Sequence, residues 1–291
     1  MAEISAQLVK ELREMTGAGL MDCKKALVEA NGDIEKAVEI LRKSGIAKAA
    51  KKLDREAKEG RVEAAVSEDR KKGSMVMLSS ETDFVARNEQ FVDFARKLVN
   101  LALEKEIAEV EKLLNETLDG SLVKDAITNL VATIGENIQL KKLATFAAPE
   151  GGLVYTYIHP GNRVGVMIEL VAENPEKSTD EKVINLAKEL TMQIAFSKPV
   201  AVSESEVPQE VIEKEKKLYE EQAKEEGKPE KAIPKIVEGR LRKFLEENCL
   251  LNQPYIRETD MTVAELVEKV SGEVGSPIRI TRFVRFEVGA A

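Results

Sequence analysis

The chain has 291 residues, a net charge of −8 and 33% charged residues, so it is long enough for two or more domains with a sizeable core. An acidic chain is a poor candidate for gripping nucleic acid phosphates over a broad surface. It contains no run of about 20 apolar residues that would predict a membrane span, and Met1-Ala2-Glu3 opens directly into a charged amphipathic pattern, so we expect no signal peptide and a cytoplasmic protein.

Residues 1–45 predict three short helices. Asn31-Gly32 ends the second helix and Asp33 caps the third. The Gly-rich loop Thr16-Gly17-Ala18-Gly19 precedes the second helix, where such a loop can hold phosphate. Because no strand precedes it and no Gly-Lys-Ser/Thr follows it, a tight helix–helix connection is the better interpretation.

A basic stretch comes after the three helices. Residues 42–58 contain seven Lys and Arg residues against Asp54 and Glu56, without a wide apolar stripe. We therefore expect residues 46–59 to form a basic, solvated and partly helical linker. A basic tether for ribosomal RNA is the alternative.

An internal repeat begins at residue 60. Each unit is a hairpin followed by a helix, first over 60–103 and again over 152–196, and alternating strands at 136–143 and 278–286 add a third strand to each unit. The sequence thus predicts an α+β protein in which two related α/β layers each have a three-stranded, largely antiparallel sheet covered by helices. The first subdomain spans 60–148, and the second spans 149–203 and 250–291.

The stretch Ser79–Asn88 connects a strand to a helix in the first subdomain. Thr82 and Asp83 are good N-cap residues, so a helix is expected to begin here with a positive dipole end. Phe84 then lies near the helix tip beside an acid. Two interpretations stay open at this point: Phe84 folds back into the core, or Asp83-Phe84 is a wedge presented to a partner.

Residues 204–249 form an insertion in the second subdomain. The stretch from Pro208 to Glu226 is strongly charged with a thin apolar seam, Gly227-Lys228-Pro229 ends one helix and restarts another, and a second amphipathic helix returns. We expect a protruding antiparallel helical hairpin. Pro234 should delay the second helix or kink its first turn.

The residues that carry chemistry do not form a catalytic or metal site. His159, the single histidine, lies in the turn His159-Pro160-Gly161-Asn162 without metal-ligand spacing. No Ser/His/Asp set can be assembled, and no pair of catalytic acids can be picked out. We therefore expect no enzyme activity, no cofactor and no metal. Cys23 and Cys249 are expected to be unpaired buried thiols.

Three motifs give the chain a family resemblance. They are Thr82-Asp83-Phe84-Val85-Ala86-Arg87-Asn88, the segment Leu12–Leu27, and the stretch from Val237-Glu238-Gly239-Arg240 through Asn252-Gln253-Pro254-Tyr255. In this order they resemble the bacterial translation elongation factor Ts family over nearly the whole length. One departure is Met77-Leu78-Ser79, where the family commonly has Glu-Val-Asn.

The resemblance implies a fold and a function. It implies a ubiquitin-associated-like domain at 1–45, a coiled-coil arm at 204–249, and a guanine nucleotide exchange factor for the GTPase elongation factor Tu, without direct nucleotide binding. In such factors the segment Thr82, Asp83, Phe84 and Val85 would intrude near the Mg²⁺ site of the GTPase and dislodge the metal. Further partner contacts carried over from the family are Lys24, Ile134, Gly135, His159 and Ile256.

Two other functions stay open. One is a non-catalytic adaptor that recruits proteins through the N-terminal helices and the arm, and the other is a ribosome- or RNA-associated protein that uses the basic tract. Release of a fluorescent GDP analogue from elongation factor Tu discriminates between these functions and nucleotide exchange.

Overall fold

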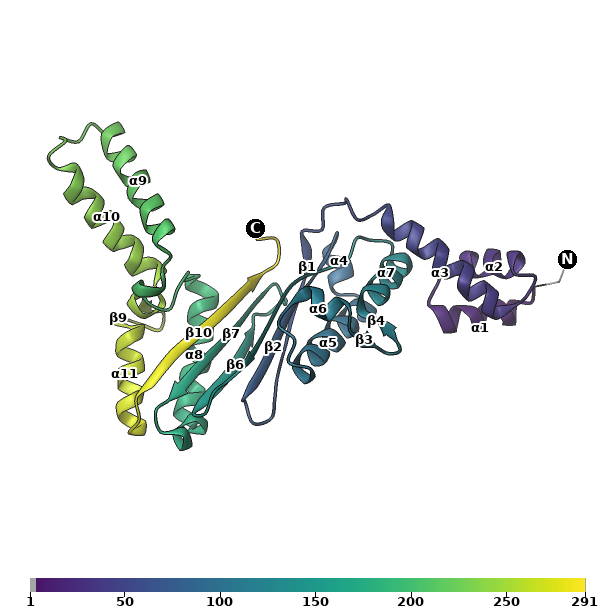
Figure 1. The fold of residues 1–291 in the computed structure, drawn as a ribbon, viewed down its shortest axis with the longest axis horizontal. Coiled ribbons are helices and arrows are strands. Elements are labelled where there is room, and N and C mark those ends of the chain that lie inside the picture. The colour runs from purple at the N-terminus through teal and green to yellow at the C-terminus, as the bar shows by residue number, and fades with distance from the viewer. Residues whose placement is uncertain (1–3, 291) are drawn as a thin grey trace.

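The computed structural model describes residues 4–290. Figure 1 shows three parts along the longest axis: a group of helices at the N-terminal end, a central body with two sheets, and a helical hairpin at the other end. Helices and antiparallel strands are mixed along the chain, which confirms the α+β class.

The N-terminal helices are α1 (Ala6–Thr16), α2 (Leu20–Glu29) and α3 (Ile34–Ala50). The Ser5 side chain caps α1, and the Asp33 side chain caps α3 by accepting from the Lys36 N–H at 3.1 Å. The three helices enclose a small aliphatic core of their own, made of Val9, Leu12, Cys23, Ala26, Leu27, Ala30 and Ala37.

Helix α3 runs past the expected boundary at residue 45 and continues through the first part of the expected linker. Gly45 faces α7 (Val123–Ile134), where a Cβ atom at position 45 would lie 3.1 Å from the Cβ of Ala132. Ala49 is buried in the core of the first layer. Small residues allow two helices to approach closely, so this part of the tract is packed rather than solvated.

The first layer is the antiparallel sheet β1 (Glu59–Val66), β2 (Lys72–Ser80) and β5 (Gln139–Ala147), in the order β1-β2-β5. Helix α5 (Glu89–Glu104) covers one face with Phe91, Ala95 and Leu98. Further elements close this core, and none of them was predicted from the sequence: α6 (Val110–Leu114), β3 (Thr117–Leu118), β4 (Ser121–Leu122) and α7.

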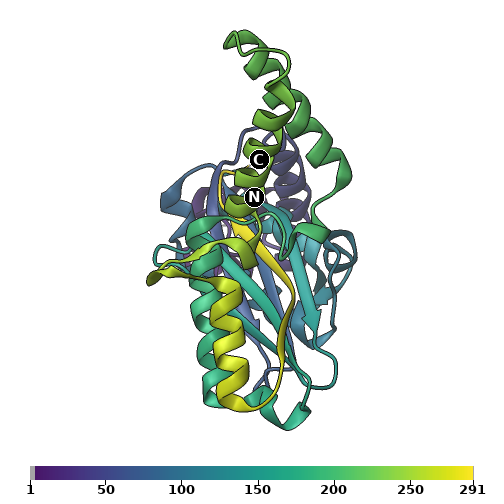
Figure 2. The same cartoon turned by 90° about the vertical axis from the view of Figure 1, so that its left-hand side faces the viewer.

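The second layer repeats this arrangement with β6 (Gly152–Ile158), β7 (Val164–Ala172) and β10 (Ile278–Glu287), in the order β10-β7-β6. Helix α8 (Glu181–Ser197) and helix α11 (Val263–Val274) lie side by side and cover its outer face (Figure 2). The remaining short elements are η1 (Pro175–Thr179), η2 (Glu204–Glu206), η3 (Leu250–Asn252), β8 (Pro254–Tyr255) and β9 (Glu258–Thr262). Helix α11 was not predicted.

The inner faces of the two sheets pack against each other. Val62, Met75, Met77 and Phe146 from the first sheet share one apolar cluster with Val154, Met167 and Phe286 from the second. The second residue of each central strand is a glycine at this contact. A Cβ at Gly73 would lie 2.5 Å from Val154, and a Cβ at Gly165 would lie 2.5 Å from Val62. The absence of a side chain at both positions therefore permits the close approach of the sheets.

The hairpin consists of α9 (Gln209–Glu225) and α10 (Ile233–Asn248), and it projects away from the sheets in Figures 1 and 2. Ala223 and Ile233 are the buried residues of these two helices, so the seam is as thin as expected. Arg240 crosses the seam to pair with Glu226 at 2.8 Å. Pro234 lies in the first turn of α10, which begins only at Ile233, and this delay agrees with the prediction.

Both cysteines, Cys23 and Cys249, are buried and unpaired, as predicted. Within residues 4–290, the helices are all too short or too polar to cross a bilayer.

Candidate functional site

The segment after β2 forms a one-turn helix, α4 (Asp83–Ala86). The Thr82 hydroxyl caps it by accepting from the Val85 N–H at 3.4 Å. The expected continuous helix is wrong here, because Asn88 starts a second helix: its side chain accepts from the Gln90 N–H at 2.9 Å and caps α5. A capped break thus separates the Thr82–Val85 segment from the long helix.

Phe84 is 81% exposed, while Phe91 on the adjoining helix is fully buried. The interpretation in which Phe84 folds back into the core is therefore wrong. Val85 packs against the first-layer core, and Asp83 pairs with Arg87 at 2.8 Å. The turn is anchored through Val85 while it holds the aromatic ring of Phe84 in solvent. Exposure of this apolar surface to water is unfavourable in the isolated protein.

The end of α7 lies next to this segment. Gly135 ends α7 in the left-handed region, with φ +94°, and Ile134 is partly buried against the first-layer core. The next residue, Glu136, accepts a hydrogen bond from the Thr82 hydroxyl at 2.6 Å. The structure therefore brings Ile134 and Gly135 to Thr82–Val85. Glu136 makes this junction, and sequence reasoning missed it because its partners lie more than fifty residues away.

The hairpin turn with His159 lies at the same end of the sheets. His159 is exposed, and its Nδ1 is 2.9 Å from the hydroxyl of Tyr157. The carbonyl of Asn162 accepts from the Val62 N–H at 2.7 Å, which attaches the turn to the first half of β1. Because Glu59, at the start of β1, pairs with Ser80, at the end of β2, the turn and α4 share one end of the body.

The other two candidate residues lie in different parts of the molecule (Figure 1). Lys24 is exposed on α2, among the N-terminal helices. Ile256 comes after the helical hairpin α9–α10, and its backbone N–H donates to Gln193 Oε1 on α8 at 2.9 Å. Next to it, burial and a 2.6 Å hydrogen bond to Glu189 raise the pKa of Tyr255 to about 12. The candidate contacts are thus spread over a long surface and do not form one cleft.

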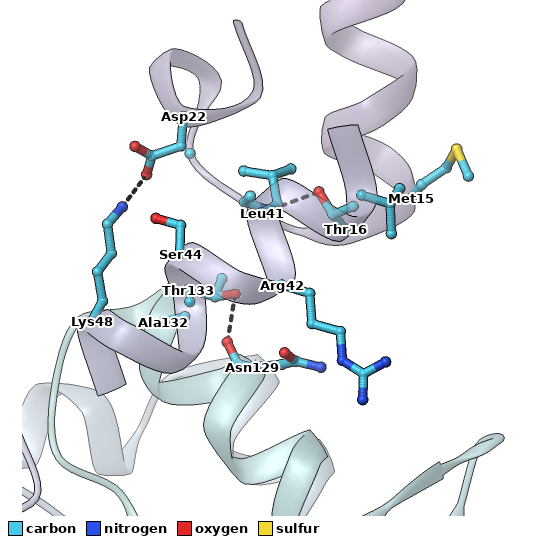
Figure 3. Close-up of a pocket in the computed structure, with 14 residues that line it drawn as sticks. Met15, Thr16, Asp22, Leu41, Arg42, Ser44, Lys48, Asn129, Ala132 and Thr133 are labelled. Carbon is cyan, nitrogen blue, oxygen red and sulfur yellow. Dashed lines mark hydrogen bonds and ion pairs between the residues drawn. The ribbon is translucent and has the colours of Figure 1, made fainter. Parts of the chain in front are cut away.

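A cavity of about 250 Å³ lies between the N-terminal helices and α7. Figure 3 shows Lys48 paired with Asp22 at its edge, at 2.9 Å, and Asn129 and Thr133 of α7 on the opposite wall. Its walls come from α3, α7, and the end of α1 and start of α2 with the loop between them, so its shape depends on how α3 docks. Within residues 4–290, no three His, Cys, Asp or Glu side chains are grouped so that they could hold a metal ion.

Comparison with known proteins agrees with the motifs. The sequence model of the family described as Elongation factor TS matches residues 81–290. The chain is 52% identical over 287 residues to Elongation factor Ts of Clostridium perfringens (strain ATCC 13124), covering 98% of this chain and 93% of that protein. It is 50% identical over 288 residues to Elongation factor Ts of Clostridium acetobutylicum, covering 98% and 92%.

These matches define the class first: the chain is a translation elongation factor, a component of protein biosynthesis. More specifically, it belongs to the elongation factor Ts family.

Proposed function

We propose that this protein is the guanine nucleotide exchange factor for elongation factor Tu and acts in the cytoplasm without being an enzyme itself. The observation that carries the proposal is the exposed ring of Phe84 on a capped, anchored turn. Thr82, Asp83, Phe84 and Val85 would enter the GTPase near its Mg²⁺ and dislodge the ion. Lys24, Ile134, Gly135, His159 and Ile256 would make further contacts.

The thermodynamics require a large interface. A factor that binds the empty GTPase better than the GDP form must weaken GDP binding by the same factor. A thousand- to ten-thousand-fold loss of GDP affinity needs roughly 4–5.5 kcal/mol, whereas burial of one Phe contributes roughly 1.5–3 kcal/mol. Phe84 can therefore supply a large share, and the remainder must come from the N-terminal helices, the His159 turn and the arm.

The proposal includes the five-part organisation of the chain: a ubiquitin-associated-like unit, a short connection, two α/β subdomains and a coiled-coil arm. The spread of the candidate contacts supports it, since they fall in several of these parts. Because α3 ends at Ala50, we propose the first boundary near residue 50 instead of residue 45.

The alternative of an RNA-bound protein is less well supported by the basic tract. Five of its seven basic side chains have partners within the chain: Arg42 with Asp125, Lys48 with Asp22, Lys52 with the carbonyl of Gly135, Arg55 with Glu81, and Lys58 with Glu56. Paired cations are less available to phosphates.

The test is the rate of GDP release from elongation factor Tu with the Phe84→Ala variant. We expect a loss of about 2 kcal/mol in exchange activity, as for a central interface anchor, with the free energy of unfolding within about 0.5 kcal/mol of the original, as for an exposed side chain. Unchanged GDP release with Phe84→Ala would exclude the wedge. No acceleration by the original chain would favour the adaptor.

A further inference from the structure

Two segments from distant parts of the sequence are locked together beneath α4. The carboxylate of Glu136 accepts from the backbone N–H groups of Glu81 and Thr82, at 3.0 Å each, and from the Thr82 hydroxyl at 2.6 Å. In return, Glu81 Oε1 accepts from the backbone N–H of Asn137 at 2.7 Å. Each segment thus supplies a carboxylate that binds the backbone of the other.

The same loop is tied to the chain beyond α3. The side-chain amide of Asn137, which is 1% exposed, donates to the carbonyls of Leu53 at 3.2 Å and Arg55 at 2.7 Å. The guanidinium of Arg55 lies 3.5 Å from the carboxylate of Glu81. Residues 135–137 therefore connect three segments: the exit from α3, the end of β2 and the start of β5.

A single helical turn needs such support. Isolated short helices are unstable in water because nucleation fixes several dihedral angles for few hydrogen bonds, and α4 has only four residues. Hydrogen bonds to an ionised acceptor are shorter and roughly twice as strong as neutral ones. The bonds from residues 81 and 82 to Glu136 therefore set the direction in which the chain enters α4, two residues before Phe84.

We propose that Glu136 is a positioning residue for Phe84. Its carboxylate preorganises the segment Thr82–Val85, so that little conformational entropy is lost when Phe84 enters the partner. Glu136 itself need not touch the GTPase, because it acts through Phe84. This inference rests on the proposed exchange function.

The first test needs no partner. In the full chain, Glu136→Gln keeps the side-chain shape but removes the charge and replaces one acceptor oxygen with a donor. We expect amide hydrogen exchange in residues 81–86 to become about tenfold faster or more, with unchanged exchange in the buried strand β7. Glu111→Gln, an exposed carboxylate on α6, is the matched control and should change neither. Unchanged protection of residues 81–86 in Glu136→Gln would overturn the proposal.

The second test measures GDP release from elongation factor Tu over a range of factor concentrations. For Glu136→Gln we expect the limiting release rate to fall about tenfold, while the half-saturating concentration changes less because the other contacts remain. In the Phe84→Ala background, Glu136→Gln should cause no further loss, since a residue that acts through Phe84 has nothing left to position. Additive losses would overturn the proposal and indicate a separate contribution.

The outcomes separate the two proposals. If the original chain accelerates GDP release and Glu136→Gln does so equally well, the positioning role fails and the exchange function stands. If the original chain does not accelerate release, both fail. Should Glu136→Gln not fold, Glu136→Asp, which keeps the charge but withdraws the carboxylate from Glu81 and Thr82 by one methylene, takes its place in the same measurements.

Discussion

The two sheet layers are built alike and are extended differently. The central strands β2 and β7 are each nine residues long, and in both every residue after the first is buried. Both have a glycine in second position and a methionine in fourth, and each glycine faces a valine of the other sheet. The two central strands therefore use the same residue types at the same positions to pack the sheets against each other.

The difference lies in the segments that come after these strands. After β2, the chain exposes Phe84 on a one-turn helix before α5 begins. After β7, a 3-10 turn leads into α8, and the long insertion comes only after that helix, as the α9–α10 arm. Buried positions thus repeat between the layers, whereas the exposed additions differ, and we infer that the scaffold and the proposed contacts are separable.

The largest effect should come from truncating the helix–sheet core of either layer. Phe91 in the first layer and Leu190 in the second are both fully buried. We expect Phe91→Ala to lower the free energy of unfolding by about 3–5 kcal/mol and Leu190→Ala by about 2–5 kcal/mol. Urea unfolding measures both, and a loss below about 1 kcal/mol in one layer would break the equivalence of the two cores.

The glycine pair sharpens the symmetry of the contact between the sheets. Gly73→Ala and Gly165→Ala each insert a Cβ against a valine and a methionine of the opposite sheet, so each should cost about 1–3 kcal/mol by overpacking. Gly239→Ala on α10 is the matched control: it meets open space and should stabilise its helix by about 0.5–1 kcal/mol. Thermal unfolding of all three variants tests this. Losses confined to one of the two sheet positions would indicate that the contact is asymmetric.

Removal of the arm tests whether the second layer's addition is separable. Val211, Ile212 and Leu245 pack against the buried cluster at the base of the arm that contains Cys249, so the cut should span 214–243 and be closed with a short Gly/Ser link. Loop-closure cost grows slowly with length, so both layers should stay folded by circular dichroism. We expect about tenfold weaker binding to elongation factor Tu, or about 1.4 kcal/mol, with slower but measurable GDP release. If the deletion variant unfolds, the arm is part of the core. If its affinity for elongation factor Tu is unchanged, the arm is not a contact surface for this GTPase.

The smallest effect concerns the pH dependence at the exit from the arm. The raised pKa of Tyr255, about 12, means that the folded protein keeps this proton after the unfolded chain has lost it near pH 10. The contribution of the protonated Tyr255 hydroxyl to the free energy of unfolding is thus complete below pH 10 and is lost as pH rises through 12. Tyr255→Phe should cost about 1 kcal/mol at pH 8 through the lost hydrogen bond to Glu189. Chemical unfolding of both chains from pH 8 to 12 should show this gap closing above pH 10, and a constant gap would contradict the link between this proton and stability.

Much of the scaffold could be read from local sequence. The hairpin-then-helix pattern at 60–103 and 152–196 identified both layers, because a period of two and a period of about 3.6 are local properties of a half-buried strand and an amphipathic helix. The charged seam and Gly227-Lys228-Pro229 identified the arm in the same way. Helix α11 also carried a signal that was missed: Thr262 and Glu265 form a reciprocal capping box.

The exposure of Phe84 was decided only by the tertiary structure. The spacing in 82–91 fits one continuous helix with Phe84 at its tip, and either fate of the ring satisfies that pattern. The caps at Thr82 and Asn88 break the helix, and Glu136, more than fifty residues away, accepts hydrogen bonds from the chain where it enters α4. The docking of α3 on α7 depends likewise on Ala132, far along the chain. Sequence periodicity reports which residues can share a face, whereas the neighbour that covers a face, or leaves it exposed, is set by contacts between distant segments.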